Sequence, residues 1–163
     1  MSDSTVQTIR PTDGELLAQF SRQGDPVAFR LLVERHSRLV WAVCRRVLQQ
    51  QQDIEDAYQA TFLVLAVQAK SIRSQHSLAG WLFTVAHRTA VRAAVERHQR
   101  QEQELDHEPA AQRQTLVEIH ERDRFEALAA ELNRLPERLR APLILFYLEG
   151  ESRQATAEQL DVT

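Results

Sequence analysis

The sequence predicts an all-α fold, made of two small helical domains that are joined by an acidic linker. Only 4 Gly and 5 Pro occur among 163 residues, and aromatic residues make up 6% of the chain. A sandwich or barrel with many tight turns would need more of these residues. The 43% hydrophobic content is enough for a packed core, and the length allows one or two small domains.

The first clear helix start lies at Asp25 and Pro26. Asp25 can accept hydrogen bonds from the free N–H groups of a first turn, and Pro26 loses no needed donor at the first helical position. The helix is expected to end before residues 49–52. Its apolar stripe repeats at steps of three and four residues and consists of Phe29, Leu32, Val33, His36, Val40, Val43, Cys44 and Val47.

A second helix is expected from Asp53 to about Lys70. Asp53 is predicted to cap it, and the carboxylates of Asp53 and Asp56 favour the positive end of the helix dipole. Glu55, Asp56 and Gln59 are expected on a different face from the buried one. The expected buried face consists of Ile54, Ala57, Tyr58, Thr61, Phe62 and Leu65.

A third helical tract is predicted from Ser77, which can cap the segment from Leu78 to about residue 103. A break is expected between Arg88 and Val91. Residues 70–100 carry six basic side chains against one acidic side chain. This charge pattern indicates a surface that binds a polyanion, although a solvated helix face would show the same charges.

The apolar period fades after residue 101, so a linker is predicted over residues 101–115. Residues 101–135 carry nine acidic side chains against four basic ones. An acidic segment directly after a basic one is expected to avoid or imitate a polyanion.

The helical pattern returns at Leu116, stops before Pro136 and resumes through Leu148. Pro142 is expected to start or kink this later helix, because it has no N–H to donate. Gly150 is expected to end it, and Ser152 is expected to cap a last helix over residues 153–160.

No motif of a catalytic or metal site is found. The sequence has no glycine-rich phosphate loop, nucleophile elbow, paired-cysteine site or His-Glu-x-x-His segment. Cys44 lies on an apolar stripe, where a buried structural thiol is expected. Glu55 and Asp56 are adjacent and point in different directions, so they are not expected to act as an acid–base pair. We predict no enzymatic activity, no metal and no cofactor.

The sequence also predicts a cytoplasmic protein. Its first residues contain neither the basic nor the apolar region of a signal peptide, and one cysteine cannot form an internal disulfide. The longest apolar run, residues 62–67, is far shorter than the roughly 20 residues that a membrane span needs. No membrane insertion is expected.

Three segments carry a family resemblance: residues 53–62 (DIEDAYQATF), 77–88 (SLAGWLFTVAHR) and 135–150 (LPERLRAPLILFYLEG). In this order they resemble bacterial RNA polymerase sigma factors of the extracytoplasmic-function (ECF) group. Residues 59–65 (QATFLVL) and 70–73 (KSIR) are also similar to variants from Planctomycetes.

The resemblance implies three functional segments. Residues 13–100 would bind core RNA polymerase and the promoter −10 element. Residues 101–115 would be the linker, and residues 116–163 would form a partial C-terminal domain for the −35 element. An anti-sigma factor is a further partner that the resemblance suggests.

For the clamp of the polymerase β′ subunit, the resemblance implies an acidic and polar helix face with an apolar anchor. Helix capping is the alternative role for Asp53, and core packing is the alternative for Phe62. Ala60 stands where many family members have an acid. The residues implied are Asp53, Glu55, Asp56, Gln59 and Phe62.

For the −10 element, mainly its non-template strand, the resemblance implies a base-holding turn followed by arginines for the phosphates. Recognition of a single strand uses cations along the backbone and planar or polar groups at the bases. Core packing is the alternative role for Trp81, and Arg88 stands where the family often has asparagine. The residues implied are Trp81, His87, Arg88, Thr89, Arg92, Arg97 and Arg100.

The sequence ends at Thr163, after the expected first helix of a helix-turn-helix, so the recognition helix is expected to be missing. Ser152, Arg153 and Gln154 are expected to contact phosphates, as a first helix does when it crosses the DNA backbone.

Two other functions stay open at this point. One is a degenerate sigma-like module that binds polymerase without initiating transcription. The other is a stand-alone helix-turn-helix regulator, which would bind double-stranded operator DNA without polymerase.

Overall fold

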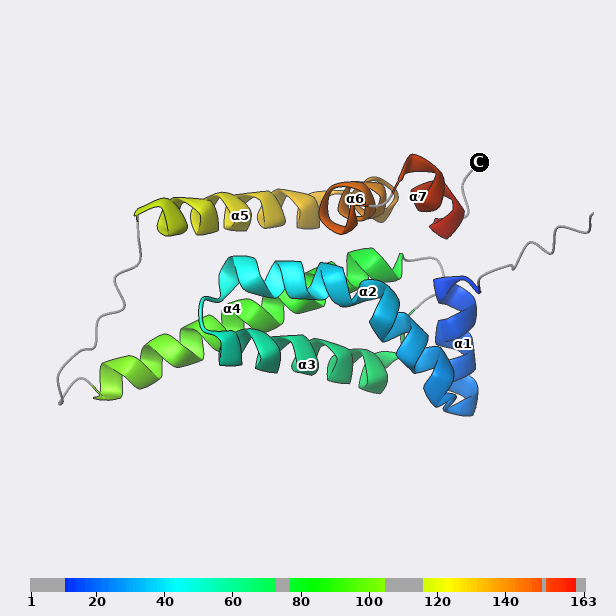
Figure 1. Ribbon diagram of the computed structural model, residues 1–163, viewed down its shortest axis with the longest axis horizontal. Coiled ribbons are helices and arrows are strands. Elements are labelled where there is room, and N and C mark those ends of the chain that lie inside the picture. Colours follow the sequence, from blue (N-terminus) through cyan, green and yellow to red (C-terminus); the bar gives the residue numbers. More distant parts are fainter. Residues whose placement is uncertain (1–10, 73–76, 105–115, 151, 161–163) are drawn as a thin grey trace, which may run out of the picture.

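The computed structural model describes residues 11–72, 77–104, 116–150 and 152–160 (Figure 1). Within these ranges the chain forms helices and turns and no strand, so the all-α prediction is confirmed. The elements are α1 (Asp13–Gln23), α2 (Pro26–Val47), α3 (Gln51–Gln68), α4 (Leu78–Glu104), α5 (Leu116–Arg134), α6 (Glu137–Ile144), the π-helical turn η1 (Leu145–Glu149) and α7 (Arg153–Gln159).

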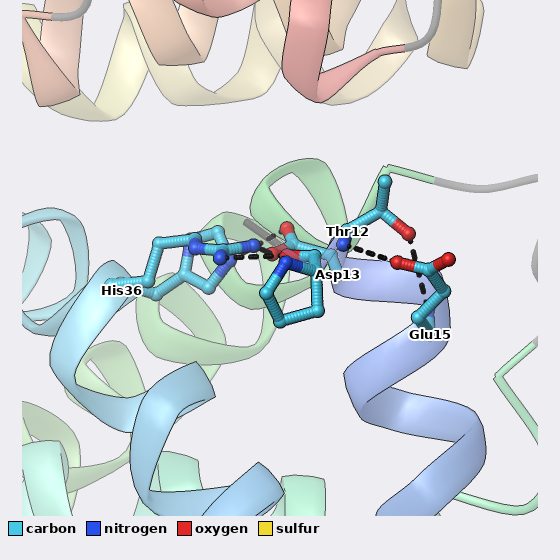
Figure 2. Close-up of polar contacts among 6 residues, drawn as sticks. Thr12, Asp13, Glu15 and His36 are labelled. Atoms are coloured by element: carbon cyan, nitrogen blue, oxygen red, sulfur yellow. Dashed lines mark hydrogen bonds and ion pairs between the residues drawn. The ribbon is translucent and has the colours of Figure 1, made fainter. Parts of the chain in front are cut away.

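Helix α1 begins with a capping box that the sequence analysis missed. The hydroxyl of Thr12 accepts a hydrogen bond from the N–H of Glu15, and the Glu15 carboxylate accepts one from the N–H of Thr12 (3.3 and 2.7 Å; Figure 2). The pattern Thr-x-x-Glu is a sequence signature of such a start. Gly24, at φ 68°, ends α1, and Asp25 caps α2 as predicted.

A buried polar cluster around Asp13 fixes α1 to α2 (Figure 2). Nε2 of His36 lies 2.8 Å from one carboxylate oxygen of Asp13, and the Arg35 guanidinium lies 2.5 Å from the other. Arg35 also donates to the carbonyl of Pro11 (2.9 Å). His36 is fully buried on the apolar face of α2, and a buried ring N–H needs such a partner.

Helices α2, α3 and α4 pack against one another and form the centre of the molecule, and α1 packs against α2 (Figure 1). A buried leucine contributes about 1.5–3 kcal/mol through the hydrophobic effect. The largest fully buried side chains of this centre include Leu32, Leu39, Leu65, Leu82 and Phe83.

Helix α3 begins at Gln51, two residues before the predicted start. Gln50 occupies the N-cap position without a side-chain hydrogen bond, so the prediction that Asp53 caps the helix is wrong. Asp53 lies in the first turn, where a carboxylate still favours the helix dipole. Glutamine is a good helix former, and this explains the earlier start.

Helix α4 is continuous from Leu78 to Glu104, so the break expected between Arg88 and Val91 is absent. Ala86 and Ala90 are fully buried, and this packing stabilises a segment that the sequence pattern left ambiguous. The first four residues of the predicted linker are helical as well, and residues 105–115 lie outside the described residues.

Pro142 lies inside α6 and does not start it. Proline removes one i→i−4 hydrogen bond, and the helix changes to the wider π-helical turn η1 three residues later. Gly150 ends this turn at φ 72°, as predicted. Ser152 accepts a hydrogen bond from the N–H of Ala155 (3.1 Å) at the start of α7, also as predicted.

The C-terminal helices pack onto the N-terminal ones. Helix α5 lies against α2, α6 lies against α4, and η1 lies against α2 (Figure 1). The guanidinium of Arg46 stands 5.3 Å from the centre of the Phe125 ring. The buried apolar residues of α5, α6 and η1 join the same cluster as those of α2–α4; they are Phe125, Ala129, Leu132, Ile144 and Leu145. No helix in the described ranges is long and apolar enough to cross a membrane.

Candidate functional site

One exposed face of α3 carries acidic and polar side chains at its start and apolar ones at its end. Glu55 and Gln59 are exposed, and Leu63 and Val67 continue the face at steps of four residues. Leu63 and Val67 are 66% and 84% exposed. Asp56 is exposed beside Glu55. The four-residue repeat from Glu55 to Val67 is a sequence signal for this face that we did not use.

Two residues predicted for the same surface point elsewhere. Phe62 is buried, and its ring packs edge-on against Tyr58 at 5.1 Å between centroids. Asp53 accepts a hydrogen bond from Arg97 of α4, which joins the two helices. The exposed face of α3 therefore consists of Glu55, Asp56 and Gln59 together with Leu63 and Val67.

A pocket of about 440 Å³ lies between α3, α4 and α6. Three residues predicted for the −10 element, Trp81, Arg88 and Thr89, line it together. An indole ring, a guanidinium and a hydroxyl in one pocket can stack on a planar group and bind an anion. The other lining residues, which sequence reasoning missed, are Val64, Gln68, Thr84, Val85 and Arg140.

The arginines of α4 differ in their partners. Arg88 is exposed and forms no ion pair within the part of the chain that the structure describes. Arg92 is 83% exposed and lies 2.8 Å from Glu96, and Arg100 lies 4.0 Å from the same carboxylate. Exposed pairs of this kind are weak, so both guanidiniums stay accessible to a phosphate. Arg97 is engaged with Asp53.

His87 does not line the pocket and contacts α5 instead. Its Nε2 is 3.0 Å from a carboxylate oxygen of Glu126 on α5, and its ring stacks on Phe83 at 6.4 Å between centroids. One turn earlier, the hydroxyl of Thr84 donates to the amide oxygen of Asn133 (2.9 Å), which also belongs to α5. Thr84 also lines the pocket, whereas His87 does not share it with Arg88 and Thr89.

The last three predicted DNA-binding residues lie on and before α7. Ser152 caps this helix, and Arg153 and Gln154 are exposed in its first turn. None of the three lines the pocket between α3, α4 and α6.

Cys44 and the side chains that could bind a metal are the remaining candidates for chemistry in the described part of the chain. Burial raises the pKa of the Cys44 thiol to about 12, so the thiol stays protonated and is a poor nucleophile. Within residues 11–72, 77–104, 116–150 and 152–160, no group of three or more His, Cys, Asp or Glu side chains is arranged to hold a metal ion.

Comparison with known proteins covers both halves of the chain. Residues 32–101 match the family described as Sigma-70 region 2, and residues 125–163 match Sigma-70, region 4. Over 158 residues the chain is 30% identical to the ECF RNA polymerase sigma-E factor of Haemophilus influenzae, a match that covers 90% of this chain and 83% of that protein. The chain belongs to the ECF sigma factors.

As a sigma factor, the protein serves promoter recognition and transcription initiation, and it binds core RNA polymerase and promoter DNA. Among solved structures, this sigma factor is similar to CnrH in complex with the cytosolic domain of CnrY. That alignment has a TM-score of 0.49 and 20% identity, and it covers 93% of this sigma factor and 84% of the other chain.

Proposed function

We propose that this sigma factor binds the β′ clamp of core polymerase through the exposed face of α3 and holds the −10 non-template strand on α4. The observation that carries the proposal is the common pocket of Trp81, Arg88 and Thr89. An aromatic ring supports a flipped or unstacked base, and each stacked base contributes about 1–3 kcal/mol.

The clamp assignment is supported by the charge and exposure of α3. Glu55, Asp56 and Gln59 are exposed, and the acidic groups suit a basic helical partner. Leu63 and Val67 add an apolar area next to them. Phe62 and Asp53 support this face from the inside: Phe62 is buried in the core, and Asp53 pairs with Arg97 of α4.

The strand assignment is supported by the cations that follow the pocket. Arg88 lies at the pocket, and Arg92 and Arg100 follow it along α4 with exposed guanidiniums. Such a row can neutralise successive phosphates of a single strand. Arg97 and His87 have a supporting role, since each is engaged by a carboxylate of a neighbouring helix.

The same function assigns a role to each segment of the chain. Residues 13–100 form the polymerase-binding and −10 domain, residues 101–115 the linker, and residues 116–163 part of the −35 domain. Ser152, Arg153 and Gln154 contact DNA phosphates there. The protein acts in the cytoplasm as a specificity subunit without catalysis of its own, and an anti-sigma factor controls its release.

A pull-down with core polymerase, followed by run-off transcription on a promoter library, tests binding and initiation together. A sigma factor as proposed is retained by core polymerase and yields transcripts from a subset of promoters. Retention without transcripts would indicate a module that only binds polymerase. Binding to duplex DNA without polymerase would indicate a stand-alone regulator.

A further inference from the structure

We propose that two copies of the free protein pair through the exposed face of α3, with the two helices antiparallel and Leu63 of each copy at a two-fold axis. The pairing is argued from the residues of α3 alone. Its consequence, that the pair and core polymerase exclude each other, rests on the proposed function of this face. A second copy of the chain is therefore a further partner of the surface proposed for the clamp.

A line of exposed side chains runs along α3 at steps of seven residues. It consists of Asp56, Leu63 and Lys70. Seven residues are nearly two turns of an α-helix, so these side chains leave the helix on the same side. Lys70 lies just past the end of α3, and Ala69 before it still has helical backbone angles (φ −50°, ψ −38°). The line therefore carries a carboxylate, an apolar side chain and a cation at equal spacing.

This line is complementary to itself in one orientation of two helices. When two copies of α3 run antiparallel with Leu63 against Leu63, Asp56 of each copy meets Lys70 of the other, because both lie seven residues from the centre. A two-fold axis makes this contact twice. Parallel helices would instead set Asp56 against Asp56 and Lys70 against Lys70, and like charges oppose association. The charges therefore select the antiparallel pair.

The centre of the pair is apolar. Val67 is more exposed than any other large hydrophobic residue in the described part of the chain, and Leu63 lies one turn before it. In the antiparallel pair, Val67 of one copy faces Gln59 of the other, because each lies four residues from Leu63. Pairing removes these exposed apolar side chains of both copies from water, and the hydrophobic effect favours their burial.

Asp56 and Lys70 are available for contacts between copies. Neither side chain forms a hydrogen bond or an ion pair within the residues that the structure describes. Glu55, by contrast, accepts a hydrogen bond from the side-chain amide of Gln51 (2.7 Å). The inner face of α3 packs on α2 and α4, and α5 lies on the other side of α2 (Figure 1). Helix α5 therefore leaves the outer face of α3 open to a second copy.

The pairing predicts a weak dimer of the free protein. One helix from each copy gives a small contact, and small interfaces are typical of transient complexes. Sedimentation velocity over a range of concentrations measures the equilibrium, and we expect monomer and dimer to exchange in the micromolar range. A chain that stays monomeric up to millimolar concentration overturns the proposal.

An exchange of charges tests the orientation of the two helices. Asp56→Lys and Lys70→Asp each set like charges against each other when a variant pairs with itself, and we expect about tenfold weaker dimers. In an equimolar mixture of the two variants, both contacts join opposite charges again, so the mixed dimer should regain the wild-type affinity. Asp123→Lys, the same reversal at an exposed position of α5, should dimerise like the wild type. Two variants that stay monomeric when mixed would contradict the antiparallel pair.

A cysteine at the axis tests the register. Leu63→Cys places one thiol of each copy beside the other, and the native Cys44 is buried and protonated, so it does not compete. In the matched control Val67→Cys, the two positions lie about 12 Å apart along the helices, and a disulfide needs Cα atoms within about 7 Å. With oxidised glutathione, we expect Leu63→Cys to form a disulfide dimer about tenfold faster than the control. Equal rates would overturn the register.

The number of copies that polymerase takes up separates this inference from the proposed function. Core polymerase titrated into wild-type protein, at a concentration where the dimer prevails, should bind one copy and dissociate the pair. Two copies on each polymerase would leave the pairing in place and show that the clamp contact lies outside this face. A chain that binds polymerase but never dimerises would overturn the pairing and leave the proposed function intact.

Discussion

Arg97 of α4 donates a hydrogen bond to the carboxylate of Asp53 in the first turn of α3. The family resemblance implied different surfaces for these residues, one for DNA and one for polymerase. The pair is partly exposed, with side-chain exposures of 37% and 23%. It joins the two helices that carry the proposed binding surfaces, so its role is to position them.

This pair predicts a modest effect on stability and a small one on DNA binding. In a double-mutant cycle of Asp53→Asn and Arg97→Ala, we expect a coupling free energy of unfolding of about 1 kcal/mol or less, because the pair is partly exposed to solvent. Urea unfolding measures it. Arg97→Ala should also weaken promoter opening less than Arg88→Ala does. An equal or larger effect would indicate that Arg97 contacts DNA directly.

Charge reversal on α3 should abolish polymerase binding. Glu55→Lys with Asp56→Lys places two cations on the face proposed to meet a basic partner, and like charges oppose association. The measurement is co-purification with core polymerase. Glu121→Lys with Glu131→Lys makes the same change in net charge on exposed positions of α5 and should still co-purify. Normal co-purification of a folded α3 variant would show that this face of α3 does not bind the clamp.

Removal of the two arginines at and after the pocket should separate promoter opening from polymerase binding. In Arg88→Ala with Arg92→Ala, we expect opening to fall while co-purification with core polymerase persists. Each arginine that no longer neutralises a phosphate of a single strand lowers the salt slope of binding by about 0.7. Arg124→Ala with Arg134→Ala, two exposed positions on α5, is the control. A parallel decrease in opening and polymerase binding would indicate that the tract is structural.

The Asp13 cluster should contribute strongly to stability. Asp13→Ala leaves the buried His36 and the nearby Arg35 without their carboxylate, and removal of one partner from a buried pair costs about 3–5 kcal/mol in free energy of unfolding. Thr12→Ala removes only the cap and should cost about 1 kcal/mol. Urea unfolding of both variants compares the two contributions. Similar decreases would contradict the anchoring role of Asp13.

Cys44 should make stability fall in alkaline solution. The pKa of its thiol is about 12 in the folded chain, and the pKa of an exposed thiol is about 8.5. The contribution is therefore fully present below about pH 8.5 and is lost as the pH rises toward 12, because the unfolded state releases the proton first. Urea unfolding of wild type and Cys44→Ala between pH 8 and 10.5 should show a steeper decline for the wild type. Parallel declines would mean that the thiol is accessible in the folded protein.

Local signals predicted much of the fold. The caps at Asp25 and Ser152, the glycine at position 150 and the apolar stripe of α2 all lie where the sequence placed them. Each depends on residues within a turn or two of one another. The uninterrupted course of α4 and the passage of α6 through Pro142 depend instead on packing against other helices, which the sequence pattern does not contain.

In the candidate site, too, the residues close together in the chain were predicted, and the contacts between distant segments were not. The family resemblance grouped Trp81, Arg88 and Thr89, and these three residues share one pocket. The pairing of His87 with Glu126 and the position of Arg140 in the pocket join residues that are far apart in the chain. No periodicity reveals such contacts.

The shared core of the N- and C-terminal helices has a consequence for recombining this protein with its relatives. Phe125 packs beneath Arg46, and Ile144 and Leu145 are buried in the same cluster as the residues of α2. Grafting the C-terminal helices of another sigma factor would replace one half of this packing and keep the other. Chimeras that exchange Arg46 and its neighbours on α2 along with the grafted helices should express as soluble protein more often than chimeras that join the two halves at the linker alone.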